Sequence, residues 1–150
     1  MTEEPKIARA YHDHGHGREF ARISLDYDAR FLRRKMLQCD DGQSLLVDLP
    51  QTTSLNHGGV LVLDGGAEIS IIAAPEELLE VTGDALARIA WHIGNRHTPC
   101  QIEDTRLLIQ RDHVIRDMLG KIGAQVCEVV EPFTPEGGAY GHGRTHSHAH

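Results

Sequence analysis

The chain has 150 residues, 40% of them hydrophobic, which is enough for one ordinary core or for two small domains. Its formal net charge of −7 disfavours nucleic acid and anionic membranes as partners, because binding either of them requires basic residues that neutralise phosphate. No stretch approaches the roughly 20 consecutive apolar residues of a membrane span, and residues 1–10 lack the apolar segment of a signal peptide, so we expect a cytoplasmic protein. The cysteines Cys39, Cys100 and Cys127 form no CxxC pair, and we expect them to be reduced.

The first half of the chain has the pattern of an antiparallel sheet, since residues 18–74 contain short apolar or alternating runs separated by turn residues. Glycine in Asp40-Asp41-Gly42 and in Asp64-Gly65-Gly66 supplies the positive φ that tight hairpins need, and Pro50 is expected to end the third strand. The expected strands are 20–25, 31–38, 44–49, 60–63 and 68–74. Residues 1–74 are therefore predicted to form an all-β domain.

In the second half the apolar residues recur at helical spacing. Stripes over residues 86–93 and 114–122 predict two amphipathic helices. Each helix has an expected cap and an expected stop: Asp84 and Gly94 for the first, Asp112 and Gly123 for the second.

Strand-like runs flank both helices and give the order β-α-β-β-α-β, which is the split βαβ arrangement of a ferredoxin-like domain. We assign this domain to residues 75–135. Beyond Pro132 glycine, proline and histidine dominate, nothing is expected to enter a core, and residues 136–150 are predicted to be a disordered His-rich tail. The fold class is therefore α+β. The expected strands of the second domain are 77–81, 102, 107–110 and 125–130.

Histidine is the unusual component of the composition, because seven of the eleven histidines lie in two terminal clusters. Neutral imidazole is a good ligand for nickel, copper and zinc, and a mobile chain lets several rings converge on one ion. An expression tag is the alternative, but Ser147 and Ala149 interrupt the run, which we therefore interpret as a natural metal-binding segment. The histidines of the carboxyl-terminal cluster are His142, His146, His148 and His150.

The amino-terminal cluster consists of His12, His14 and His16, separated by Asp13 and Gly15. It has the same chemistry as the tail but is shorter. A metal site and a solvated polar loop are equally good interpretations of this cluster, and both stay open.

Among the histidines of the expected folded part, His97 is distinctive because it lies in the constrained loop 94–99, between glycine and proline. One imidazole cannot hold an ion well, so a site at His97 needs further ligands, most simply the same histidine of a second subunit across a two-fold axis. His113, in the first turn of the second helix, is either a metal ligand or an ordinary surface residue. We expect His92 to lie on or pack against its helix and His57 to belong to a turn.

Several segments together form one family pattern: Leu25-Asp26-Tyr27, Asp40-Asp41-Gly42, Ala74-Pro75-Glu76, the run from Trp91 to Pro99, Asp112-His113-Val114 with Met118-Leu119, and the histidine-ended tail. With these segments, from about residue 18 to the end, the chain resembles the UreE urease accessory proteins, the nickel metallochaperones of urease maturation. The resemblance implies an amino-terminal β domain, a ferredoxin-like metal-binding domain, and a homodimer in which His97 of both subunits binds nickel. It also implies delivery to apo-urease together with an accessory GTPase.

Two residues depart from the family pattern. Arg111 stands where some relatives carry a histidine two positions before the one that matches His113, and a permanent cation cannot be a ligand. Cys100 offers a thiolate that would favour copper(I) or zinc, with a small buried side chain as the alternative. Since imidazole binding follows the Irving–Williams order, nickel is expected from the resemblance, and Zn²⁺ and Cu²⁺ are alternatives.

Three classes of function fit a histidine-rich chain. A nickel metallochaperone uses a folded histidine and a mobile tail, whereas a storage or buffering protein for divalent metals needs only the tails. A hydrolytic metalloenzyme needs about three fixed ligands and a general base, and neither HExxH nor Gly-x-Ser-x-Gly occurs in the sequence. We therefore expect a metallochaperone without catalytic activity. The expected metal ligands are His97, His113, His142, His146, His148 and His150.

Overall fold

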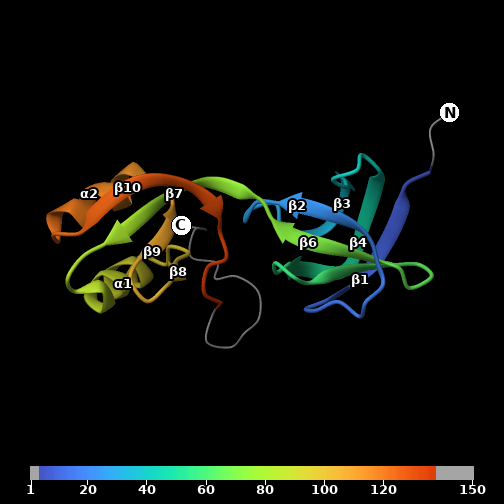
Figure 1. Cartoon of the computed structure of the whole chain (residues 1–150), viewed down its shortest axis with the longest axis horizontal. Coiled ribbons are helices and arrows are strands. Elements are labelled where there is room, and N and C mark those ends of the chain that lie inside the picture. The colour runs from blue at the N-terminus through green and yellow to red at the C-terminus, as the bar shows by residue number, and fades with distance from the viewer. Residues whose placement is uncertain (1–3, 138–150) are drawn as a thin grey trace. The chain divides into compact units, whose positions relative to one another are not determined.

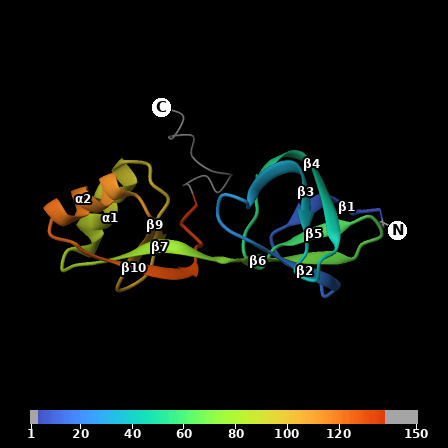
Figure 2. The ribbon, with the colours of Figure 1, turned by 90° about the horizontal axis from the view of Figure 1, so that it is seen from above.

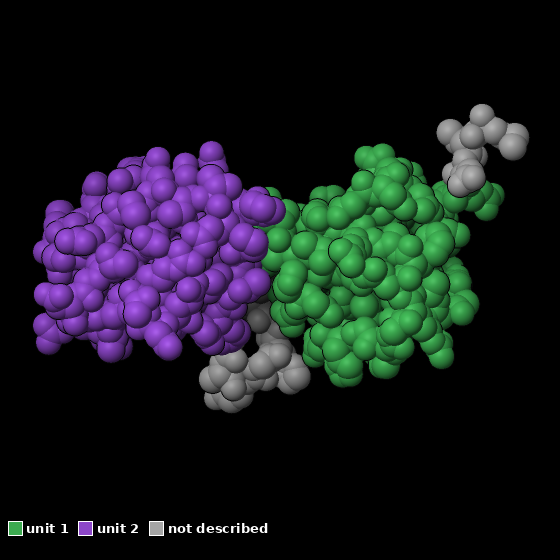
Figure 3. Space-filling model, in the orientation of Figure 1, with its two compact units in different colours: residues 1–74 green, residues 75–150 purple. Residues whose placement is uncertain are grey.

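The computed structural model describes residues 4–137, and the chain divides into two compact units, residues 1–74 and residues 75–150 (Figures 1 and 3). We call them unit 1 and unit 2. The described part of unit 1 is built from strands, and that of unit 2 combines strands with two helices. Neither of these helices is long and apolar enough to cross a membrane. The four histidines of the tail and its predicted disorder lie outside the described residues.

Unit 1 is one six-stranded sheet with the strand order β2-β6-β5-β1-β4-β3. Alternation places one set of side chains inside: Leu45, Val47 and Leu49 of β4 are buried, whereas the residues between them are not. They join a core with Ile69 and Ile71 of β6. The strands are β1 (Lys6–His12), β2 (Glu19–Leu25), β3 (Phe31–Gln38), β4 (Ser44–Ser54), β5 (Val60–Leu63) and β6 (Glu68–Ala73).

The expectation of an antiparallel sheet is wrong for two strand pairs. Strand β1 pairs with β4, and β2 with β6, in parallel. The expected hairpins β3–β4 and β5–β6 are confirmed as antiparallel pairs, and Gly42, Gly65 and Gly66 have φ of 95°, 102° and 98°. The sequence prediction also missed β1 itself, because its apolar residues come in two adjacent pairs around Arg9 and do not alternate with polar ones.

Pro50 lies inside β4 instead of ending it. The pairing of β4 with β3 shifts register here, from Arg34 opposite Asp48 to Leu32 opposite Thr53. A proline is tolerated at such an irregularity because its missing N–H is not needed for the ladder. The strand therefore continues to Ser54.

Unit 2 has the element order β-α-β-β-α-β and an antiparallel sheet with the strand order β10-β7-β9-β8. Both helices lie on one face of this sheet (Figure 2). Each helix buries two residues four positions apart, Ile89 and Ile93 in one and Ile115 and Leu119 in the other. The elements are β7 (Pro75–Thr82), α1 (Leu86–Asn95), β8 (Gln101–Ile102), β9 (Leu107–Gln110), α2 (His113–Lys121) and β10 (Gln125–Pro132).

The predicted ends are confirmed for α2 and wrong for α1. Asp112 caps α2, since its Oδ1 accepts the N–H groups of Val114 at 2.9 Å and Ile115 at 3.1 Å, and Gly123 follows the helix with φ of 86°. Asp84 is not the cap of α1, because Ala85 occupies that position without a side-chain hydrogen bond. Gly94 lies within α1 and does not stop it.

The chain after β10 also contributes to the packed structure, contrary to the expectation from the sequence. The side chain of Phe133 is 0% exposed. The N–H of Thr134 donates to Gln101 Oε1 at 2.8 Å, and that of Glu136 donates to the carbonyl oxygen of Cys100 at 2.9 Å. Residues 133–136 therefore hydrogen-bond to Cys100 and Gln101, where the chain enters β8.

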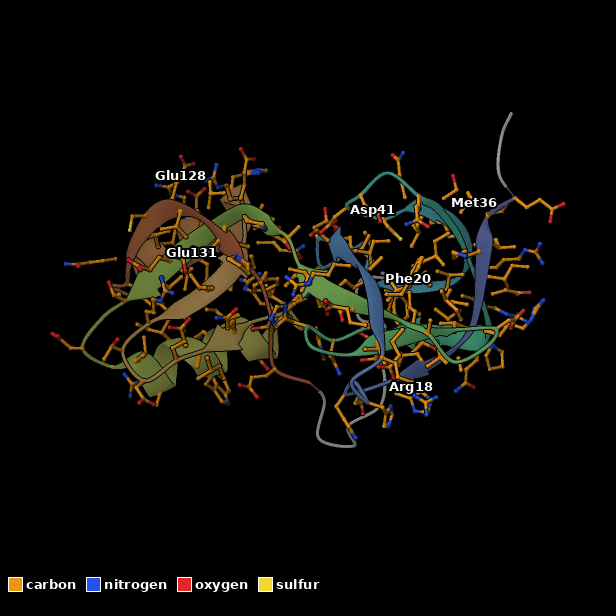
Figure 4. The ribbon with its side chains drawn as sticks, turned by 45° about the vertical axis from the view of Figure 1, so that its right-hand side comes forward. Arg18, Phe20, Met36, Asp41, Glu128 and Glu131 are labelled. Atoms are coloured by element: carbon orange, nitrogen blue, oxygen red, sulfur yellow. The ribbon has the colours of Figure 1, made fainter. Side chains whose placement is uncertain are left out.

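A charged cluster around Arg106 joins three parts of unit 2. The guanidinium contacts Glu131 of β10 at 2.7 Å, Glu80 of β7 at 2.9 Å and Glu103 of the β8–β9 turn at 3.1 Å (Glu131 is labelled in Figure 4). Its hydrogen bonds hold the pKa of both Glu131 and Glu80 below their usual range. The cluster thus fixes the β8–β9 turn against the two neighbouring strands.

Replacing Arg106 with Met should lower the free energy of unfolding of unit 2 by about 1–2 kcal/mol, because charge-assisted hydrogen bonds between partly exposed side chains are lost. The lowered pKa of Glu80 and Glu131 means that their contribution is present above pH 4.5, the usual carboxyl value, and lost as pH falls through the folded-state values. R106M should therefore lose less stability between pH 7 and pH 3 than the unmodified chain.

Urea unfolding followed by the fluorescence of Trp91, the single tryptophan, reports on unit 2. Arg88→Met on the exposed side of α1 is the matched control. Equal losses in the two variants would show that the Arg106 cluster does not stabilise the fold.

Candidate metal centre

His97 lies in the turn that ends α1 and is exposed. The helix closes with two hydrogen bonds, from the N–H of His97 to the carbonyl of Gly94 at 2.9 Å and from the N–H of Thr98 to the carbonyl of Ile93 at 3.4 Å. This pair of bonds is the Schellman motif, in which the residue after the cap adopts the left-handed conformation. His97 occupies that position.

The backbone of His97 is unusual for a residue with a side chain. Its φ is 58°, and it is the one non-glycine residue with a positive φ between residues 4 and 137. Glycine is the common residue at this position of a helix end, because a Cβ there costs roughly 1–2 kcal/mol. A histidine retained in such a conformation suggests a functional constraint on its side chain.

Trp91 lies one turn of α1 before this loop, and its side chain is 63% exposed. The Trp91 ring contacts the ring of His92 edge-on, with centroids 5.0 Å apart. Sequence reasoning did not single out Trp91 as an exposed residue. The signal was present, because residue 91 falls outside the apolar stripe of 86, 89, 90 and 93 and so points away from the core.

His97 has no complete set of ligands in the described residues. No group of three His, Cys, Asp or Glu side chains between residues 4 and 137 is arranged to hold a metal ion. His113, the first residue of α2, is exposed, and the structure does not bring it into such a group with His97. Any site at His97 must therefore draw ligands from elsewhere, such as a second chain or the tail.

Arg111 has a structural role next to His113. Its Nε donates to the carbonyl of Leu78 and its Nη2 to the carbonyl of Val129, both at 3.1 Å. The guanidinium thereby links β7 and β10, a task that an imidazole could not perform with the same reach. The departure from the family pattern at this position thus has a structural explanation.

Cys100 is a packed thiol rather than an available thiolate. Its side chain is half-buried against the core of unit 2. Burial raises the pKa of Cys100 to about 11, so the group stays protonated at neutral pH. This agrees with the interpretation as a small buried residue.

The remaining histidines separate into structural residues and a cluster in unit 1. His57 lies in a turn, as predicted, and its Nδ1 accepts the N–H of Ala73 at 3.0 Å. His12 ends β1, and His14 and His16 follow it in the loop before β2. The tail histidines His142, His146, His148 and His150 are outside the described residues.

Comparison with known proteins covers both units. The family model for the UreE urease accessory protein, N-terminal domain, matches residues 5–74, and the model for the UreE C-terminal domain matches residues 76–150.

Curated relatives cover most of the chain. The urease accessory protein UreE of Ruegeria sp. (strain TM1040) is 70% identical over 148 residues, which is 97% of this chain and 84% of that protein. The proteins of the same name from Ruegeria pomeroyi and Rhodobacter capsulatus are 68% and 56% identical, over 86% and 85% of this chain and 87% and 81% of their own lengths. The resemblance noted in the sequence is confirmed: this chain belongs to the UreE urease accessory protein family.

Proposed function

We propose that this chain is a nickel-binding metallochaperone that delivers nickel for assembly of the urease active site. The observation that carries the proposal is His97, an exposed imidazole held at φ 58° at the end of a helix, in a chain of the UreE family. The relatives named above are called urease accessory proteins. The partners of this chain would be apo-urease and its accessory GTPase, and no catalytic activity is part of the proposal.

In this proposal nickel binds between two copies of the chain. Two His97 imidazoles related by a two-fold axis supply two ligands from one sequence position, whereas a single chain supplies only one ligand from that position. Trp91 and Val114, 63% and 53% exposed on the two helices, offer apolar surface that a subunit interface could cover. The βαββαβ order and the antiparallel sheet of unit 2 support its interpretation as a ferredoxin-like metal-binding domain, residues 75–135.

The tail, residues 136–150, is proposed to capture ions and pass them to His97. A flexible segment of ten residues, the length of 141–150, would have a root-mean-square reach of very roughly 17 Å and could sample solution and fold back over a nearby site. Because the tail is tethered to the same chain, its local concentration near His97 would favour transfer of an ion to His97 over escape of that ion into solution. His142, His146, His148 and His150 would supply the ligands, and His113 would be an additional one.

A storage or buffering protein for divalent metals is the second candidate, because seven of eleven histidines lie in terminal clusters. A store depends on those clusters and has no need of His97. Nickel is the proposed ion; imidazole also suits Zn²⁺ and Cu²⁺. The two functions differ in whether one tightly bound ion per dimer survives removal of the tail.

Replacing His97 with Ala or with Gly should remove the tightest nickel ion, because both changes delete the imidazole. The two variants should differ in stability. Gly adopts a φ of 58° freely, so H97G should exceed H97A by roughly 0.5–1 kcal/mol in free energy of unfolding. Nickel titration calorimetry and urea unfolding measure the two effects separately.

His92→Ala is the control for the His97 variants, since it removes an imidazole from the same helix region and should leave the tight ion in place. Tight nickel binding that persists in both His97 variants would refute the proposed site. Equal stability of H97A and H97G would show that the loop does not hold residue 97 in the left-handed conformation.

Deleting residues 141–150 should lower the number of bound ions and slow loading at scarce nickel, while leaving a dimer that activates urease when nickel is plentiful. Urease activation measured across a nickel series, with the full-length and the shortened chain, tests this division of labour. If activation is lost equally at every nickel concentration, the tail belongs to the transfer site itself. If no nickel ion that depends on His97 remains after the deletion, storage is the better function.

A further inference from the structure

The histidine cluster of unit 1 is part of an ordered turn. His12 is the last residue of β1, and Gly15 lies so close to its surroundings that a Cβ there would be 3.3 Å from Val60 Cγ1 and 3.6 Å from Glu68 Oε1. The three imidazoles lie next to one another: the rings of His12 and His16 are 5.3 Å apart between centroids, and those of His14 and His16 are 5.4 Å apart. These contacts argue against the freely solvated loop that the sequence left open.

Glu68 anchors this turn from inside unit 1. Its side chain is only 3% exposed. The carboxylate accepts the backbone N–H of His16 at 2.9 Å and that of Arg18 at 3.2 Å. Two backbone N–H groups thus satisfy a carboxylate that lies almost entirely inside unit 1.

Glu68 also orients the ring of His16. Nδ1 of His16 lies 3.0 Å from Glu68 Oε2, and the tautomer that carries its hydrogen on Nδ1 donates to this carboxylate. In the neutral ring the lone pair is then on Nε2, on the side away from Glu68. A carboxylate that accepts from one ring nitrogen while the other is available is the usual support of a metal-binding histidine.

The rings lie close enough together to share one ion once they turn toward it. Two imidazoles bound to one tetrahedral zinc ion, with ligand nitrogens about 2.0–2.1 Å from the metal, have ring centres roughly 5 Å apart. The rings of His12 and His14 lie 5.3 and 5.4 Å from the ring of His16. Binding therefore needs a change of ring direction and little change of ring position.

From this geometry we propose that His12, His14 and His16 form a second metal site, distinct from His97, that takes a divalent ion which imidazole binds well, such as Zn²⁺. Glu68 is the positioning residue of the site. The three imidazoles of residues 12–16 are not yet closed around one point, since no ligand group of three is preformed between residues 4 and 137. His12 and His14 are exposed, so their rings can turn toward the ion at little cost.

Open space lies beside two of the three rings. A hollow of about 310 Å³ is lined by His12, His16, Arg18, Val62, Gly66 and Glu68 (Arg18 is labelled in Figure 4). The negative charge of Glu68 offsets the positive charge of Arg18. Nη1 of Arg18 lies over Gly66, 3.0 Å from the position that a Cβ of residue 66 would occupy. Three histidines and one water complete a four-coordinate site.

The test uses a full-length background in which His97 and the tail histidines His142, His146, His148 and His150 are replaced with Ala, so that binding in unit 1 is measured without the proposed nickel site. Titration calorimetry with Zn²⁺ alone should find one ion per chain in this background. Adding His12→Ala and His14→Ala should abolish that ion, whereas adding His92→Ala and His113→Ala, the matched control, should leave it. Circular dichroism checks that each variant is folded.

Two further measurements separate a built site from loose histidine binding. Co²⁺ in place of Zn²⁺ should give the intense visible absorption of a tetrahedral complex. Glu68→Gln should weaken Zn²⁺ binding by about 10–100-fold, because the carboxylate that orients His16 is lost. Absence of the ion from the background, or its persistence after loss of His12 and His14, would overturn the proposal whatever the fate of nickel delivery by His97.

Discussion

The way α1 ends is the constraint on which the proposed nickel site depends. Ile93 is fully buried and its carbonyl accepts the N–H of Thr98, so the core of unit 2 fixes the first residue of the closing turn. The turn can close only if residue 97 takes a left-handed backbone, and Pro99 then prevents the helix from resuming. The backbone at this position is fixed by a rigid helix end, and the histidine side chain leaves it toward solvent.

Two arginines link the strands of unit 2 through contacts that the shorter side chain of histidine could not reach. Arg111 donates to carbonyls of β7 and β10, and Arg106 joins carboxylates of β7, β10 and the β8–β9 turn. Arginine suits both tasks because its planar group donates in several directions and stays charged. Trp91 and His97 lie on the exposed side of α1 and of the turn that ends it, and they take no part in these contacts. Stability and the proposed binding surface thus use separate residues.

Local patterns in the sequence predicted the elements well where one interaction decides the outcome. Asp112 caps α2 by bonding two backbone N–H groups, and Gly42 permits a hairpin, so the residue type alone was informative. The errors came where distant segments decide. Parallel pairing of β1 with β4 depends on the whole sheet, and Pro50 is tolerated because the register shifts between Leu32 and Arg34 of β3. The left-handed φ of His97 is set by hydrogen bonds to α1, which residue spacing does not reveal.

Glu68 shows the same limit for a candidate site. In the sequence it is one carboxylate at the start of an expected strand, 52 positions from His16, and only the sheet brings it beneath that ring. The consequence is chemical, because the two proposed sites use one residue type in two ways. In the proposed nickel site His97 would contribute one ligand per chain, so an ion bound there would be shared between copies and given up when they separate. In the second proposed site His12, His14 and His16 would all come from one chain, next to the buried Glu68, so an ion bound there would not depend on a second copy. A site of the first kind suits transfer, and a site of the second kind suits retention.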